Sequence, residues 1–215
     1  MSAIRLLALI LLCTILLGAC GRSELIRIRM LTPVNENKKD HSILTETTES
    51  STPIYTNTSS GGSLYFLLKS IGLGYTTVTT KMEKTSIKLK ETTTLKTNFA
   101  DVAFGIGENY SFMWGAGVLS GSEHEMYLEY TDKGKEQLLV SSDPVGHSLF
   151  FMLAHHGFGF ETLLGYRMNF IKTEFDDSKS KIPTYMGKSG KDVSYEDTNI
   201  SITTSQVQLG IGVTF

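Results

Sequence analysis

The chain has 215 residues, with 20 Lys and Arg residues against 22 Asp and Glu residues and a formal net charge of -2. This balance lacks the basic surface that binds nucleic acid phosphates, so we expect no nucleic acid partner. With 20 glycines, 4 prolines and 2 cysteines, the composition also excludes a collagen, a coiled coil and a disulfide-stapled scaffold.

The amino-terminal segment has the pattern of an export signal. Arg5 precedes an apolar run over residues 6–17, which is too short to span a bilayer as a helix, and small residues follow. We therefore predict a signal peptide over residues 1–19. Leu17-Gly18-Ala19-Cys20 resembles the bacterial lipobox, which implies that Cys20 is acylated and becomes the first residue of the mature chain. The alternative is an ordinary secretory signal that is cleaved nearby.

A polar segment follows the predicted signal. Residues 36–62 are mainly Glu, Asn, Lys, Asp, Ser and Thr, and they cannot bury enough apolar area to offset their chain entropy. We predict that residues 20–62 form a flexible Ser/Thr-rich tether. A patch at residues 25–31 alternates as a strand would, but it stands alone before the tether.

From residue 63 to residue 215 the periodicity is that of β-strands. In the last segment, apolar residues alternate with small or polar ones. Its apolar face consists of Val207, Leu209, Ile211, Val213 and Phe215. The same alternation occurs at residues 71–76, 102–107, 110–118 and 164–170. We therefore predict an all-β domain over residues 63–215.

Glycines are concentrated on the polar face of these strands, for example Gly210 and Gly212. On the surface of a soluble protein, such glycines would weaken the strands without a packing gain. In a narrow closed barrel, glycines facing the lumen relieve crowding, while the large apolar side chains face lipid. The sequence therefore favours a barrel whose apolar face points outward.

The connections between strands and the final residues indicate the class of barrel. Tight turns at residues 107–109 and 157–159 contrast with long polar segments at 80–93, 120–144 and 175–198, an asymmetry typical of outer-membrane barrels. The closing nine residues, 207–215, resemble the carboxy-terminal signal by which such proteins engage the barrel-insertion machinery. The resemblance implies a closed antiparallel up-and-down transmembrane β-barrel in the bacterial outer membrane, in contact with outer-membrane lipid.

The number of strands depends on one hairpin. Six strands are evident, at residues 64–80, 94–107, 110–120, 147–156, 160–173 and 199–215. A hairpin of residues 125–130 with 137–140 would supply two more, and the resulting eight satisfies the even number usual in bacterial barrels. In the rival interpretation this hairpin extends the flanking strands above the membrane, which leaves six.

Candidate site residues lie on the face predicted to line the lumen. Glu161 and Arg167 share one face of a strand, and Asp101 points inward from another. Buried charges must pair or meet water, so these residues form either a structural salt bridge or a gate for solutes. His147, Ser148 and Glu161 could be assembled into a hydrolase triad. His155 and His156 point to opposite faces of a strand and cannot chelate one ion together. We expect no enzyme, metal site or cofactor.

Three functions remain compatible with these observations. The first is an integral outer-membrane barrel with a structural or surface-interaction role, whose extracellular partner the sequence does not identify. The second is a narrow pore or a carrier of small hydrophobic molecules across the outer membrane. The third is a lipid-anchored soluble β-sandwich that acts as a binding module.

Overall fold

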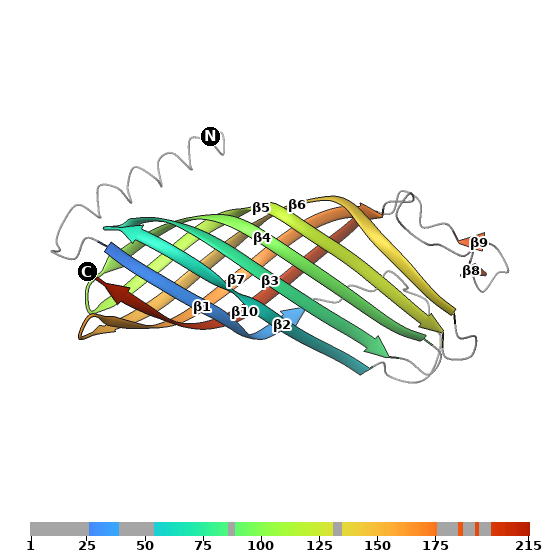
Figure 1. Cartoon of the computed structure of the whole chain (residues 1–215), viewed down its shortest axis with the longest axis horizontal. Coiled ribbons are helices and arrows are strands. Elements are labelled where there is room, and N and C mark those ends of the chain that lie inside the picture. Colours follow the sequence, from blue (N-terminus) through green and yellow to red (C-terminus); the bar gives the residue numbers. More distant parts are fainter. Residues whose placement is uncertain are drawn as a thin grey trace, which may run out of the picture.

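The computed structural model describes residues 26–38, 54–85, 89–130, 135–175, 185–186, 192–193 and 199–215. Eight strands form a closed antiparallel barrel in the order β1-β10-β7-β6-β5-β4-β3-β2 (Figure 1). They are β1 (Ile26–Lys38), β2 (Ile54–Leu68), β3 (Ile71–Thr85), β4 (Leu89–Gly107), β5 (Tyr110–Tyr130), β6 (Lys135–Gly157), β7 (Phe160–Phe175) and β10 (Asn199–Thr214). The short strands β8 (Tyr185–Met186) and β9 (Asp192–Val193) pair only with each other. The closed barrel confirms the predicted fold and excludes the β-sandwich.

The amino-terminal boundary of the barrel differs from the prediction. The isolated patch is the start of β1, which pairs with β10 from Arg27–Thr214 to Lys38–Thr204 and also pairs with β2. Residues 26–38 and 54–62 therefore belong to the barrel, and the predicted tether over 20–62 is wrong there. Backbone ladders give these polar residues hydrogen-bond partners without requiring apolar burial. Cys20 and residues 39–53 lie outside the described residues.

The predicted count of eight strands is correct, but two assignments change. The predicted strand at residues 64–80 is divided by a turn at Lys69 and Ser70, in which Lys69 has a φ of 55°. The predicted hairpin at 125–130 and 137–140 instead extends β5 and β6, as its rival interpretation required, with Glu125 opposite Val140. The predicted loops at 80–93 and 120–144 are shortened accordingly, because the strands continue into them.

Both ends of the described barrel lie at one rim. The short turns at Lys69–Ser70, Glu108–Asn109 and Phe158–Gly159 connect neighbouring strands at this rim, which we name the short-turn rim. The Phe215 amide donates to the Ile26 carbonyl at 2.9 Å, so the first strand begins where the last strand ends (Figure 1). We name the opposite end, where β5 and β6 project, the far rim.

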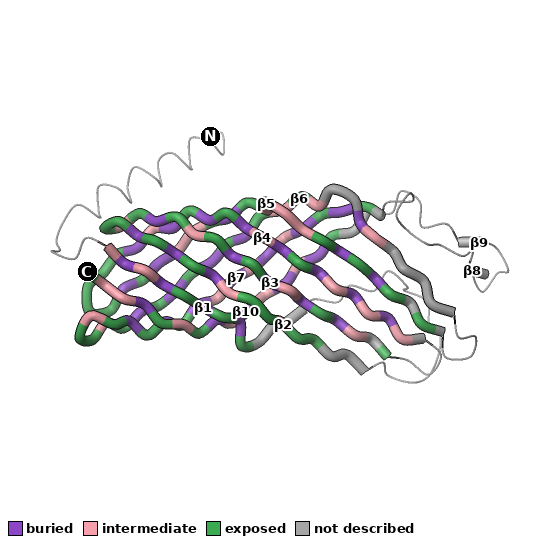
Figure 2. The backbone as a smooth tube through the Cα atoms, viewed as in Figure 1, coloured by how far each residue is buried: buried purple, intermediate pink, exposed green. Residues whose placement is uncertain are grey.

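Burial alternates along each strand (Figure 2). On β10, Leu209, Ile211 and Phe215 are 48%, 67% and 69% exposed. Val207 and Val213 share this outer face and are partly exposed, whereas Gln208 is buried in the lumen. The large apolar side chains therefore point outward, as the glycine distribution predicts. Among the described residues, no helix is long and apolar enough to cross a membrane.

Candidate functional site

Side chains fill the lumen of the barrel. Among the largest fully buried side chains are Arg29, Arg167, Tyr65, Phe99 and Leu67, which come from β1, β7, β2 and β4. A small barrel is just wide enough for its interior side chains to fill it. The described lumen is consequently a packed interior that contains buried charges.

One charged layer lies near the short-turn rim. Two nitrogens of Arg29 donate to the two carboxylate oxygens of Glu161, from Nε to Oε2 at 2.7 Å and from Nη2 to Oε1 at 2.8 Å. Arg29 also donates to Ser111 Oγ at 2.7 Å, and Arg27 lies 3.8 Å from Glu161. This two-pronged geometry is the strong form of an arginine–carboxylate contact.

A second charged layer lies farther from that rim. Arg167 donates from Nη1 to Asp101 Oδ2 at 2.8 Å and from Nη2 to Asp101 Oδ1 at 2.9 Å. Its Nη2 also donates to Ser148 Oγ at 2.5 Å, and its Nε donates to Asn169 Oδ1 at 2.9 Å. The Arg167 guanidinium is thereby held by residues on β4 and β6 as well as on its own strand, β7.

Hydroxyl groups and aromatic rings complete the surroundings of this second ion pair. Thr76 Oγ1 donates to Asp101 Oδ2 at 2.7 Å, and the Tyr65 hydroxyl donates to the same oxygen at 3.2 Å. The guanidinium carbon of Arg167 lies 4.7 Å from the centre of the Phe99 ring and 5.4 Å from that of Phe150. Both charges are thus paired and enclosed, as burial of an ion pair requires.

Apolar side chains separate the two charged layers. Along β7 the inward residues are Glu161, Leu163, Gly165 and Arg167, so Leu163 lies between the two charges. It belongs to a buried apolar cluster drawn from several strands. The cluster comprises Leu31, Tyr65, Leu67, Ala103, Met113, Phe150, Met152, Ala154 and Leu163. Water or a polar solute would have to cross this apolar cluster as well as both ion pairs.

Glycine residues on neighbouring strands leave room in the lumen for the second ion pair and its surroundings. A Cβ atom on Gly117 would overlap Asp101 Oδ1 and would lie 2.7 Å from Ser148 Oγ. A Cβ atom on Gly74 would overlap the Tyr65 ring. The inward glycines therefore relieve crowding in the lumen, which is the role that their distribution in the sequence indicates.

The structure divides the three predicted lumen charges between two ion pairs. Arg167 pairs with Asp101, whereas Glu161 pairs with Arg29 from β1. Arg29 was not among the predicted lumen charges, because its segment falls within the predicted tether over residues 20–62. The alternation of Arg27 and Arg29 with Ile26 and Ile28 was the available signal for a strand with a charged inner face.

The candidate hydrolase triad is not assembled. The outward His147 ring stacks on Phe170 with 5.1 Å between ring centres, whereas Ser148 lies in the lumen and accepts from Arg167. Glu161 is bound by Arg29. Among the described residues, no group of three or more His, Cys, Asp or Glu side chains could hold a metal ion.

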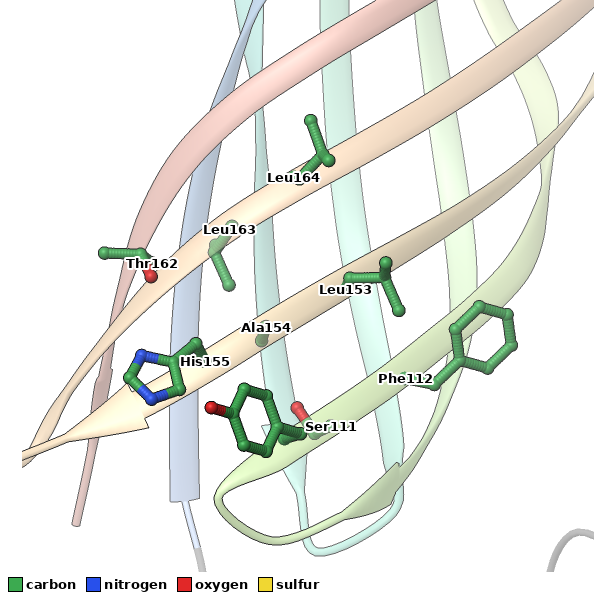
Figure 3. A pocket seen from close by; sticks show the side chains of 9 residues that line it. Ser111, Phe112, Leu153, Ala154, His155, Thr162, Leu163 and Leu164 are labelled. Atoms are coloured by element: carbon green, nitrogen blue, oxygen red, sulfur yellow. The ribbon is translucent and has the colours of Figure 1, made fainter.

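The outer surface near the short-turn rim carries aromatic and apolar side chains. A groove of about 420 Å³ crosses β5, β6 and β7 there, and Phe112, Leu153 and His155 are among the residues that line it (Figure 3). The rings of Tyr110 and His155 lie 4.8 Å apart at this edge. Aromatic residues at such a level are typical of the girdles that mark a membrane interface.

The outer surface toward the far rim carries exposed ion pairs. Lys96 lies 2.6 Å from Glu123, and Lys81 lies 2.8 Å from Glu83. The hydrogen bond with Glu123 raises the pKa of Lys96, while hydrogen bonding from Lys81 lowers the pKa of Glu83. Water screens such pairs, so they define a solvated surface more than they stabilise the fold.

No family model matches the sequence, and no curated protein matches it. Similar solved structures include Neisserial surface protein A, at 11% identity, over 90% of this chain and 98% of that chain, with a TM-score of 0.40. The outer membrane protease OmpT from Escherichia coli is 10% identical over 89% and 79% of the respective chains, with a TM-score of 0.48. Outer membrane protein OprG from Pseudomonas aeruginosa is 10% identical over 89% and 95%, with a TM-score of 0.36. At such low identity, each similarity is one of backbone path and assigns no role to any individual residue.

Proposed function

We propose that this protein is an integral barrel of the bacterial outer membrane that serves a structural or surface-interaction role and performs no catalysis. The observation that carries the proposal is the distribution of polarity across the barrel wall. Paired charges such as Arg167 and Asp101 occupy the lumen, whereas large apolar side chains occupy the outer face at the same end of the barrel. Water disfavours this arrangement and a bilayer stabilises it.

The outer apolar side chains form a belt that begins at the short-turn rim. On β5 the outward residues are Tyr110, Phe112, Trp114, Ala116 and Val118. This run has about the length of a strand that crosses a bilayer at a tilt. On β7 the outward residues are apolar from Phe160 to Phe170, apart from Thr162. We call this outward-facing surface the apolar belt.

The outer face of the barrel becomes more polar toward the far rim. Inside the barrel there, buried apolar side chains such as Met82, Leu95 and Met126 lie among buried polar ones such as Glu91 and His124. The outward positions of the same region include the exposed residues Lys81, Lys96, Glu123 and Glu125. This end therefore has a polar outer surface around an interior of mixed polarity. We infer that it projects beyond the membrane and offers its wall and far rim to partners outside the cell.

The packed lumen argues against a pore. Both ion pairs and the apolar cluster between them would have to separate before a hydrated ion could pass. We expect no conductance steps in planar bilayers that contain the purified barrel. Regular single-channel steps from the native protein would favour the pore or carrier instead.

Two tests address insertion itself. A folded membrane barrel should resist extraction by sodium carbonate, and its mobility in a detergent gel should shift after boiling. Release of the protein by carbonate, together with unchanged mobility, would contradict the proposal. Small soluble periplasmic proteins provide the extraction control, because sodium carbonate releases them from the membrane fraction.

The carboxy-terminal strand is the proposed contact with the barrel-insertion machinery. Leu209, Ile211 and Phe215 are exposed on the outer face of β10, where a receptor could reach them. Deletion of Phe215 should lower the amount of heat-shifting barrel in the outer membrane. Deletion of a residue from the far rim should not lower this amount. Equal losses of heat-shifting barrel from both deletions would contradict a specific terminal signal.

A further inference from the structure

The barrel wall divides where β1 and β2 stop pairing. Their ladder runs only from Ile26–Leu68 to Leu31–Ser63. Beyond that pair, β1 continues along β10 to Lys38, and β2 lies along β3 back to Ile54 (Figure 1). We call this point the β1–β2 fork.

A side-chain contact replaces the ladder at the fork. Thr32 Oγ1 donates to the Gly61 carbonyl at 3.1 Å, and Gly61 has a φ of 125°. A Cβ atom on Gly61 would overlap the Thr77 carbonyl oxygen, so the local chain path requires glycine. The strands therefore separate at a defined position rather than through gradual fraying.

A groove of about 670 Å³ lies on the outer wall at this fork. Its end toward the far rim is mainly polar or without side chains, with Leu209 opposite Thr32 as the apolar exception, and its end toward the short-turn rim is apolar. The first end includes Thr32, Gly61, Gly62 and Thr77, and the second includes Met30, Leu64 and Ile211. Strand direction fixes this order, because Met30 precedes Thr32 on the outgoing β1 and Gly62 precedes Leu64 on the returning β2.

The apolar belt is also shortest beside the fork. On β2 the outward apolar run extends only from Leu64 to Leu68, and Gly62, Ser60 and Thr58 follow toward the far rim. On β3 it extends from Ile71 to Tyr75 before Thr77. On β7, by contrast, the belt reaches Phe170. Beside the fork, lipids of the outer leaflet would therefore contact hydroxyl groups of the barrel wall. At the same depth on the rest of the wall, they would contact apolar side chains.

Backbone polar groups that face hydrocarbon need hydrogen-bond partners. Beyond Leu31 and Ser63, the facing edges of β1 and β2 no longer exchange ladder bonds. The polar end of the groove therefore favours an occupant with hydrogen-bonding groups, while its other end favours an apolar one. An outer-leaflet lipid satisfies both, because its head group lies toward the exterior and its chains point toward the membrane centre.

We propose that the β1–β2 fork binds one outer-leaflet lipid, with its polar head beside Thr32 and Thr77 and an acyl chain in the groove along Met30, Leu64 and Ile211. This site rests on the proposed membrane insertion. Insertion is measured separately, by carbonate extraction and heat-shifted mobility, so the two proposals can fail independently.

The test compares two tryptophan variants of the full chain by native mass spectrometry after gentle detergent extraction from outer membranes. Leu64→Trp fills the groove, whereas Leu149→Trp changes a similar residue on β6 that does not line it. The two leucines are 50% and 46% exposed, so the variants are matched. Loss of contact with about two methylene groups should weaken lipid binding by Leu64→Trp roughly tenfold, and so lower its lipid-bound fraction.

Wild-type protein and Leu149→Trp should each retain one lipid, and both tryptophan variants should still shift on heating. Thr32→Val provides a second test that preserves side-chain shape while removing the hydroxyl, and it should also weaken lipid retention. Equal lipid retention by Leu64→Trp and the wild type would overturn the site. So would equal loss from both tryptophan variants, or a lipid-free dimer as the native species.

Discussion

Arg167 on β7 and Asp101 on β4 form a two-pronged ion pair inside the barrel, with N···O distances of 2.8 Å and 2.9 Å and both side chains buried. The two strands are not neighbours, because β6 and β5 lie between them in the barrel wall. This contact therefore ties together parts of the wall that share no backbone ladder.

Arg167→Met should strongly destabilise the barrel because it leaves Asp101 buried without its cationic partner. Removal of one member of a buried pair costs about 3–5 kcal/mol. The measurement is the free energy of unfolding in denaturant, for protein reconstituted in lipid vesicles. The double variant Arg167→Met with Asp101→Asn should recover part of the loss. An effect no larger than that of Lys96→Met, which breaks an exposed pair, would contradict the assigned role.

Gly117→Val should impair folding because the new side chain would occupy the position of the Asp101 carboxylate. Overpacking of a filled interior costs about 1–3 kcal/mol and sometimes more. The fraction of protein with heat-shifted gel mobility measures the effect. Gly157→Val is the matched control, since a Cβ atom there would meet nothing within 4 Å. Similar folded fractions for the two variants would show that Gly117 does not relieve crowding.

The stability that the two exposed ion pairs contribute should be lost at opposite ends of the pH scale. Because hydrogen bonding from Lys81 lowers the pKa of Glu83, its contribution is present above the unfolded-state pKa and is lost as pH falls through the folded-state value. Because Glu123 raises the pKa of Lys96, that contribution is present below the unfolded-state pKa and is lost as pH rises through the folded-state value.

Thermal midpoints measured across pH test this assignment. Glu83→Gln should lower the midpoint at neutral pH, and its difference from the wild type should disappear as pH falls. Lys96→Met should also lower the midpoint at neutral pH, and its difference should disappear as pH rises. Both effects should be small and should diminish in high salt, because water and ions screen exposed pairs. A salt-insensitive change at neutral pH would point to another role for these residues.

Cys20→Ser should abolish incorporation of radiolabelled fatty acid if the lipobox resemblance is correct. The sequence places Cys20 six residues before Ile26, where β1 begins at the short-turn rim. The variant should still insert, because the apolar belt does not depend on the lipid. Ser2→Ala provides a control within the signal segment. Undiminished labelling of Cys20→Ser would instead favour an ordinary secretory signal.

The sequence alone determined the class of fold and the orientation of its strands. Side chains alternate across a strand with a period of two, so the contrast between Leu209 or Ile211 and Gln208 or Gly210 is a local property of the chain. The same period of two predicted that the side chains of Arg167, Asp101 and Glu161 point into the lumen. The turn at Lys69 and Ser70 escaped prediction because Ser70 is its only usual turn residue, and it contains no glycine, proline or asparagine.

Only the tertiary structure decided which residues meet. Arg29 and Glu161 are 132 positions apart, and they pair because barrel closure brings β1 beside β10 and close to β7. The β1–β2 fork likewise depends on where two ladders end, which no single segment specifies. Alternation fixes the face on which a side chain lies. The register and stagger of the closed barrel fix the level at which it lies, and therefore its partner.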